Sequence, residues 1–198
     1  MKKTTKWILI IVIAILLVSV WSWRYISLNE YWESTIPEEY SETVFSIGET
    51  VVFGEDIFLP EGYALCVNSI DLQDYPEFLA ENQITLENEQ SRPPARLALV
   101  NITLSNIGEK EEGISLLEFS LHGLDEYFSF NAELLAAINP VLQGNVGIIL
   151  RPGESYDFVL VYEIRDEYLS HYTREHFDTY ELYLTTTVYP SKQEIKVQ

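Results

Sequence analysis

The sequence predicts an all-β protein, an antiparallel β-sandwich preceded by one N-terminal transmembrane helix. Residues 7–23 form a continuous apolar run without a charge. From Thr43 onward, roughly seven to nine short segments with apolar residues at every second position alternate with Gly, Pro and Asn turns, a pattern typical of a sandwich. Outside the first run, no stretch has the 3.6-residue period of a long amphipathic helix.

The apolar run 7–23 has the features of a membrane anchor. A helix over this range is about 25 Å long, near the short end for spanning a bilayer. Trp7 stands at one end and Trp21 and Trp23 at the other, and indole rings favour membrane interfaces. Lysines precede the run and acidic residues follow it, which predicts a cytoplasmic N-terminus and an extracellular C-terminal domain at the cell membrane. A cleaved signal peptide is the alternative, although no Ala-x-Ala site follows the apolar core.

The chain divides into four predicted parts. Residues 1–24 hold the signal anchor, and residues 25–42 form a polar, acidic stalk in which Pro37 ends any continuation of the helix. Residues 43–190 form the sandwich, and residues 191–198 are expected to be a frayed C-terminal tail.

The clearest strand is Tyr156–Ile164, which follows a Pro152-Gly153 turn. Its even-numbered residues are all apolar or aromatic, so one face is expected to be buried. Residues 96–107 alternate in the same way. The remaining strands are expected within residues 43–53, 63–72, 114–122, 127–131, 144–150 and 179–189, and short helical turns within 75–94, 132–137 and 165–178.

The charge distribution restricts the partners. The net charge is −19, four of the 12 basic residues flank the apolar run, and all 31 acidic residues follow that run. Nucleic acid is excluded as a partner, because binding it requires Lys and Arg to neutralise phosphates. Basic proteins, cationic peptides or divalent cations are compatible partners, whereas in the simplest interpretation the acidity only keeps the domain soluble.

No catalytic or cofactor motif is present: the sequence lacks His-Glu-x-x-His, Gly-x-Ser-x-Gly and a phosphate-binding glycine loop. The candidate ligands are the histidines His122, His171 and His176 and the acidic groups Asp71/Asp74/Glu77, Asp125/Glu126 and Asp166/Glu167. None of these groups has the spacing of a known zinc or calcium site. We therefore predict no catalytic, cofactor-binding or metal-ligating residue, and no cofactor. Cys66, the single cysteine, lies in an apolar segment and is expected to be buried and inert.

One group of aromatic residues has two interpretations. Its members are Tyr127, Phe128, Phe130, Tyr168, Tyr172 and Phe177. They form either an exposed surface for recognising a protein or glycan, or packing between the two sheets.

Three segments resemble a recurrent arrangement of strands and turns: Arg96–Asn106, Ile148–Ser155 with its Arg-Pro-Gly-Glu turn, and Phe158–Ile164 with its Tyr-Glu step. The arrangement is similar to that of uncharacterised Gram-positive membrane-anchored extracellular proteins with a telokin-like, immunoglobulin-like domain. The resemblance covers roughly residues 45–190. It implies an immunoglobulin-like extracytoplasmic sandwich, and it transfers no functional residue because these families have no assigned activity.

These observations together predict a membrane-tethered extracytoplasmic binding module of unknown partner at a bacterial cell envelope, and not an enzyme. The first alternative is an accessory or immunity-type protein that captures cationic peptides or a toxin. The second is an envelope hydrolase that uses a pair of carboxylates.

Overall fold

The computed structural model describes residues 12–27, 41–54, 59–85, 93–188 and 191–198, in two compact units, residues 1–40 and Ser41–Gln198. In the first unit, residues 12–27 are helical, and the rings of Trp21 and Tyr25 stack with centroids 5.7 Å apart. Within the described residues, no helix combines the length and the apolar character that crossing a membrane requires. Residues 7–11 of the predicted span and residues 28–40 of the predicted stalk lie outside the described residues.

The second unit is built mainly of strands. Its strands are β1 (Ser41–Ser46), β2 (Thr50–Val52), β3 (Tyr63–Asp74), β4 (Arg96–Asn106), β5 (Gly113–Ser115), β6 (Ser120–His122), β7 (Tyr127–Phe130), β8 (Gly147–Ile149), β9 (Ser155–Ile164), β10 (Tyr183–Thr187) and β11 (Ser191–Lys196). Its helices are α2 (Tyr75–Glu81), α3 (Ala132–Ile138) and α4 (His171–Glu175), with 3-10 turns η1 (Leu116–Glu118), η2 (Pro140–Leu142), η3 (Asp166–Tyr168) and η4 (Phe177–Thr179).

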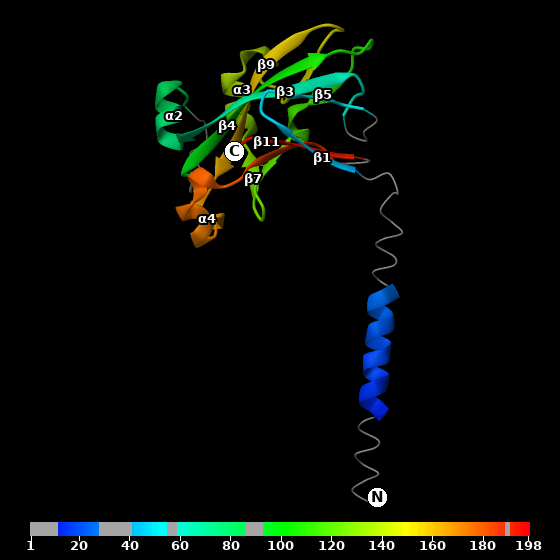
Figure 1. Cartoon of the computed structure of the whole chain (residues 1–198). Helices are drawn as coiled ribbons and strands as arrows, with labels where there is room; N and C mark the ends of the chain where they lie inside the picture. The colour runs from blue at the N-terminus through cyan, green and yellow to red at the C-terminus, as the bar shows by residue number, and fades with distance from the viewer. Residues whose placement is uncertain (1–11, 28–40, 55–58, 86–92, 189–190) are drawn as a thin grey trace, which may run out of the picture. The chain divides into compact units, whose positions relative to one another are not determined.

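The strands form a β-sandwich, as the sequence predicts. One layer has the order β1-β11-β10-β6-β7 and the other β9-β4-β3-β2, and β7 pairs with both β6 and β9, which joins the layers into one nine-stranded sheet. Strands β3, β4 and β9 lie above β1 and β11 (Figure 1). A separate pair, β5 and β8, completes the fold.

The main core lies between the layers. The predicted buried face of β9 is confirmed for Phe158, Leu160, Tyr162 and Ile164, each at most 1% exposed, whereas Tyr156 at the start of the strand is 41% exposed. The Tyr162 hydroxyl donates to the carbonyl oxygen of Phe119 over 2.9 Å, so the buried phenol has a partner.

A second, smaller core covers part of the outer face of β3-β4-β9. Its members are Tyr75, Phe78, Leu97, Leu99, Leu134 and Val161. Helix α2 contributes Tyr75 and Phe78 to it, and helix α3 contributes Leu134. The strands contribute Leu97, Leu99 and Val161. This helical cover explains why the outer face is apolar at Leu97 and Leu99 of β4 and at Val161 of β9.

Three predictions are wrong. Residues 191–198 are no frayed tail: Ser191–Lys196 is strand β11, and Ile195 and Val197 are buried in the core. The sheet is not wholly antiparallel, because β1 pairs with β11 in parallel. Cys66 is half-exposed, since its side chain is on the outer face of β3, where the sheet lacks a cover.

Candidate binding groove

Two adjoining hollows lie on the outer face of β3-β4-β9, beside the helices that cover the rest of this face. The first, about 460 Å³, is lined by Asn68, Asn101, Ile102, Ile138, Asn139, Pro140, Val141, Tyr156, Asp157, Phe158 and Val159. The second, about 410 Å³, is lined by Asp71, Gln73, Phe78, Glu81, Asn82, Leu99, Asn101, Ile138 and Val159. Because the hollows share Asn101, Ile138 and Val159, we treat them as one groove.

The wall beside β9 is fixed by Asn139, a residue that sequence reasoning missed. Its side-chain Nδ2 donates to the Val159 carbonyl oxygen, and its Oδ1 accepts from the Val159 amide, both over 2.9 Å. Nδ2 also donates to the Leu135 carbonyl oxygen in α3. The amide side chain thus replaces a neighbouring strand at the edge of β9 and holds Ile138 over the groove.

The wall beside β3 is formed by α2. Pro76 occupies the first turn of this helix, where its missing amide hydrogen costs nothing, and Phe78 packs into the smaller core. Asn82 ends the helix, and its side-chain Nδ2 donates to the Phe78 carbonyl oxygen over 2.9 Å. This geometry leaves Glu81 at the rim of the groove with an exposed side chain.

Short polar side chains at and beside the floor of the groove bond across the strands. Thr103, in the middle strand, accepts from Asn68 over 2.9 Å and donates to Asp157 over 2.6 Å. Asn101 donates to Ser69 over 3.1 Å on the adjacent row. Each of these pairs uses only part of the hydrogen-bonding capacity of its members, so acceptors remain available to a ligand.

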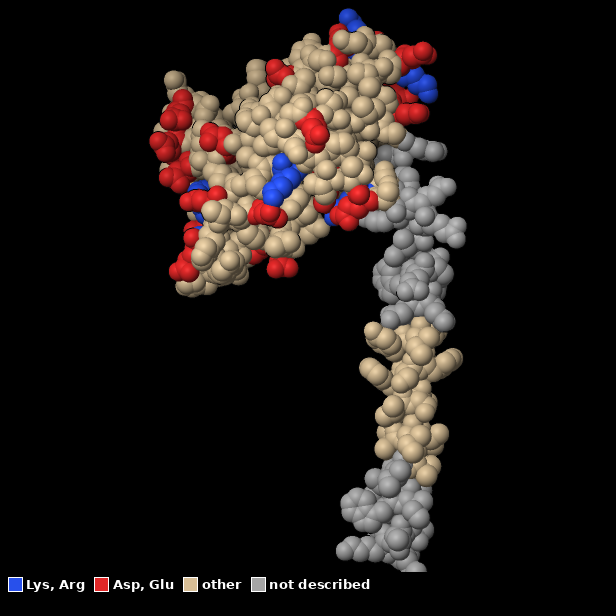
Figure 2. All heavy atoms as spheres, in the orientation of Figure 1, with Lys and Arg blue, Asp and Glu red and all other residues tan. Residues whose placement is uncertain are grey.

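The groove is anionic. Asp71, Glu81 and Asp157 are exposed carboxylates, and no Lys or Arg is among the described residues that line either hollow. Asp71 accepts one hydrogen bond, from Gln73 over 2.8 Å. Carboxylates also gather around α2 on the surface of the domain (Figure 2). Such a groove can attract a cationic ligand and repels an anionic one.

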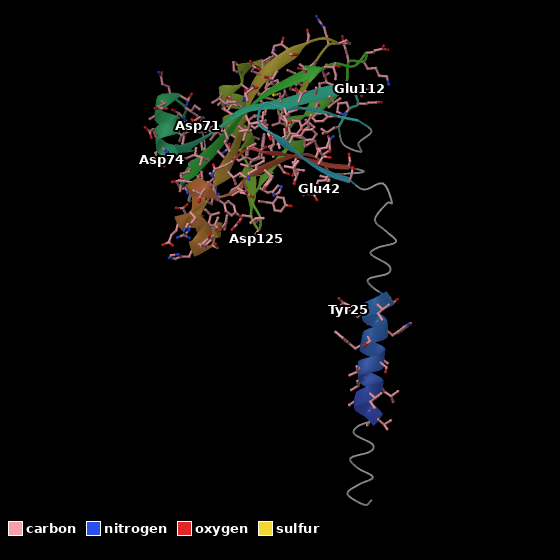
Figure 3. The ribbon with its side chains drawn as sticks, viewed as in Figure 1. Tyr25, Glu42, Asp71, Asp74, Glu112 and Asp125 are labelled. Atoms are coloured by element: carbon pink, nitrogen blue, oxygen red, sulfur yellow. The ribbon has the colours of Figure 1, made fainter. Side chains whose placement is uncertain are left out.

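The structure separates the three acidic groups that the sequence suggested. Asp71 and Asp74 lie beside α2 (Figure 3), but of their group only Asp71 lines the groove. Glu126 accepts from the Thr173 hydroxyl over 3.1 Å and from the Tyr180 hydroxyl, which is a structural role. Asp166 lies 3.9 Å from Arg96.

The three histidines are not brought together. His122 lies between the Gly123 carbonyl oxygen and the Glu194 carboxylate, with both ring nitrogens 2.7 Å from an acceptor. His171 lies 3.3 Å from Glu175, and His176 stacks on the Tyr172 ring at 4.4 Å. In the part of the chain that the structure describes, no group of three or more His, Cys, Asp or Glu side chains could hold a metal ion.

The aromatic group divides between the two interpretations. Phe128 and Phe177 are buried and meet edge to face, with centroids 6.0 Å apart. Tyr127, Tyr168 and Tyr172 are each at least 69% exposed. The phenylalanines therefore pack the core, and only the tyrosines are available for contact with another molecule.

The sequence contains only part of the information that identifies Asp157 and Asn101 as residues of the groove. Both are polar residues inside strong strand patterns, which indicates a solvent-facing side. That signal does not show that β3, α2 and α3 lie beside β4 and β9, because this arrangement depends on long-range pairing and packing.

The comparisons with known proteins identify the family. The model of the domain of unknown function DUF5028 matches residues 42–193. The chain belongs to this family. No curated protein matches the chain.

Several solved structures are similar to this DUF5028 protein. The yjhA protein of Bacillus subtilis is 17% identical, with 78% of this chain and 99% of that chain covered and a TM-score of 0.42. An uncharacterised β-sandwich protein of Clostridium difficile is 11% identical, with 81% and 97% covered and a TM-score of 0.41. A putative lipoprotein of Bacillus subtilis, ycdA, is 13% identical, with 69% and 36% covered and a TM-score of 0.43.

Proposed function

We propose that this DUF5028 protein is a membrane-tethered, extracytoplasmic binding module whose immunoglobulin-like sandwich captures a basic segment of a protein or peptide. The observation that carries this proposal is the groove on β3-β4-β9, which has three exposed carboxylates and no basic side chain among its described lining residues. Lys and Arg side chains are the complementary partners of such a surface. Nucleic acid is repelled by it.

The tether is supported by the N-terminal unit. Helix 12–27 exposes Ile15, Leu16, Leu17, Val18 and Val20, each by at least 58%. The preceding residues 7–11 continue the uncharged run in the sequence. Lipid is a suitable environment for an apolar helix of this kind, and the lysines before it favour a cytoplasmic N-terminus in a cell membrane.

We propose binding rather than catalysis because two of the groove carboxylates are far apart. Asp157 pairs with Thr103 and Asp71 pairs with Leu99, so they differ by four residues along β4 and lie on opposite sides of it. With standard strand dimensions, their Cα atoms are about 17 Å apart. Glycoside hydrolases hold their two carboxyl groups about 5–9.5 Å apart.

A defined probe tests the binding. The full chain in mild detergent should bind a fluorescent Lys-rich peptide and not a Glu-rich peptide of equal length, as measured by fluorescence anisotropy. Affinity should fall as salt rises, because exposed charges are screened within about 8 Å at physiological ionic strength. Absence of binding to the Lys-rich peptide at low salt would overturn the proposal.

A matched pair of double variants locates the site. Asp71→Asn with Asp157→Asn removes two charges from the groove, and Glu112→Gln with Glu118→Gln removes two exposed charges elsewhere. Asp71 and Glu112 lie at opposite ends of the domain (Figure 3). Only the first double variant should lose binding, and equal loss in both would mean that net charge alone attracts the peptide.

The proposed extracellular location of the C-terminal domain has its own test. A protease added to intact cells should remove a tag fused to Gln198 if the C-terminal domain is extracellular. A tag that is cleaved only after cell lysis would contradict this part of the proposal.

A further inference from the structure

We infer that the groove selects an extended segment whose two basic side chains are four residues apart, an inference that rests on the proposed function. The inference rests on the register of the paired strands. Leu99, the partner of Asp71, precedes Thr103, the partner of Asp157, by four residues on β4. Both carboxylates are exposed on the same outer face. The two residues are about 14 Å apart along the strands, and the further offset of about 10 Å across β4 is left to the two long basic side chains of the ligand.

The groove offers suitable contacts between these two charges. The row midway between them contains Ser69, Asn101 and Val159, which pair with one another across the three strands. Asn101 donates to Ser69 with its Nδ2, so its Oδ1 can accept a backbone N–H of a bound segment. Val159 and Ile138 are half-buried and line both hollows, which gives apolar contact for the middle residue of the segment.

The conformation of the ligand follows from these spacings. In an extended chain, residues four apart lie on the same side and are about 14 Å apart, which matches the separation of the two carboxylates along the strands. Residues three or five apart point to opposite sides of the chain. In an α-helix, four residues advance only about 6 Å, so a helical ligand with the same sequence reaches one carboxylate at a time.

A peptide series tests the spacing. Short Ser/Thr/Val peptides would carry two lysines separated by two, three, four or five positions, and each would be titrated against the full chain in mild detergent. The four-position peptide should bind about fivefold more tightly than the others, the upper value for one exposed ion pair. Asp71→Asn or Asp157→Asn alone should abolish this preference, whereas Glu112→Gln should preserve it.

The outcomes distinguish the inference from the proposed function. Equal binding of all four peptides, lost in the double variant Asp71→Asn with Asp157→Asn, overturns the spacing and keeps the groove as a site for basic ligands. Tightest binding of the three- or five-position peptide also overturns the spacing. Binding that the double variant leaves unchanged overturns the proposed function itself.

Discussion

Two carboxylates, one in each layer of the sandwich, have opposite surroundings. Glu194 on β11 is 4% exposed, and its Oε1 accepts from His122 over 2.7 Å and from Thr185 and Lys192 over 2.9 Å. Asp157 on β9 is exposed and accepts one hydrogen bond, from Thr103. Burial demands that a charge be fully paired, whereas exposure lets a charge keep acceptors for a ligand. The difference separates a carboxylate that holds the fold from one that is available for binding.

The largest expected effect comes from Glu194→Ala. The substitution leaves His122 and Lys192 without their buried acceptor, so the free energy of unfolding should fall by about 3 kcal/mol. Urea denaturation followed by circular dichroism measures it. Glu112→Ala is the control and should change stability by less than about 0.5 kcal/mol. Similar losses in both variants would remove the distinction between the two kinds of carboxylate.

Asn139→Ala should have the next largest effect. It leaves the amide and carbonyl groups of Val159 without the two bonds that close the edge of β9, which should cost about 2 kcal/mol. Hydrogen exchange at the Val159 amide should become faster than at the amide of Tyr162, which pairs with Ala98 of β4 and Phe130 of β7. Unchanged protection at Val159 would show that Asn139 does not hold this edge.

The pH dependence of stability should reflect Glu194. Burial alone would raise its pKa, but hydrogen bonds from Lys192, His122 and Thr185 outweigh burial and lower the pKa below its ordinary value of 4.5. Because the folded-state pKa is depressed, the stabilisation is complete above about pH 4.5 and is lost as the pH falls through the lower folded value. The difference in unfolding free energy between the wild type and Glu194→Ala should therefore shrink on acidification. A difference that grows instead would contradict the lowered pKa.

The smallest effect on stability is expected for Asp157→Asn. The amide oxygen of Asn still accepts the Thr103 hydroxyl, and the position is exposed, so the free energy of unfolding should change by less than about 0.5 kcal/mol. Thermal unfolding measures the change. A loss above about 1 kcal/mol would make Asp157 a structural residue like Glu194.

Comparing the predicted elements with the observed ones shows which parts of the fold the sequence predicts. The alternation in residues 156–164 and 96–106 determined β9 and β4, because a buried face imposes a period of two whatever its neighbours are. The short helix at Ala132–Ile138 was also predicted, as one helical turn before Asn139-Pro140. Strand β11 was missed, because Ser191–Lys196 is mostly polar and becomes a strand only between β1 and β10.

The sequence by itself determined the strand-rich domain, the apolar N-terminal run and the excess of acid, because periodicity and composition are local properties of the chain. Only the tertiary structure decided which acidic side chains lie together in the groove. Asp71 and Asp157 are 86 positions apart in the sequence and share one groove because β3 and β9 pair on either side of β4. Strand register depends on long-range pairing, and no local pattern records it.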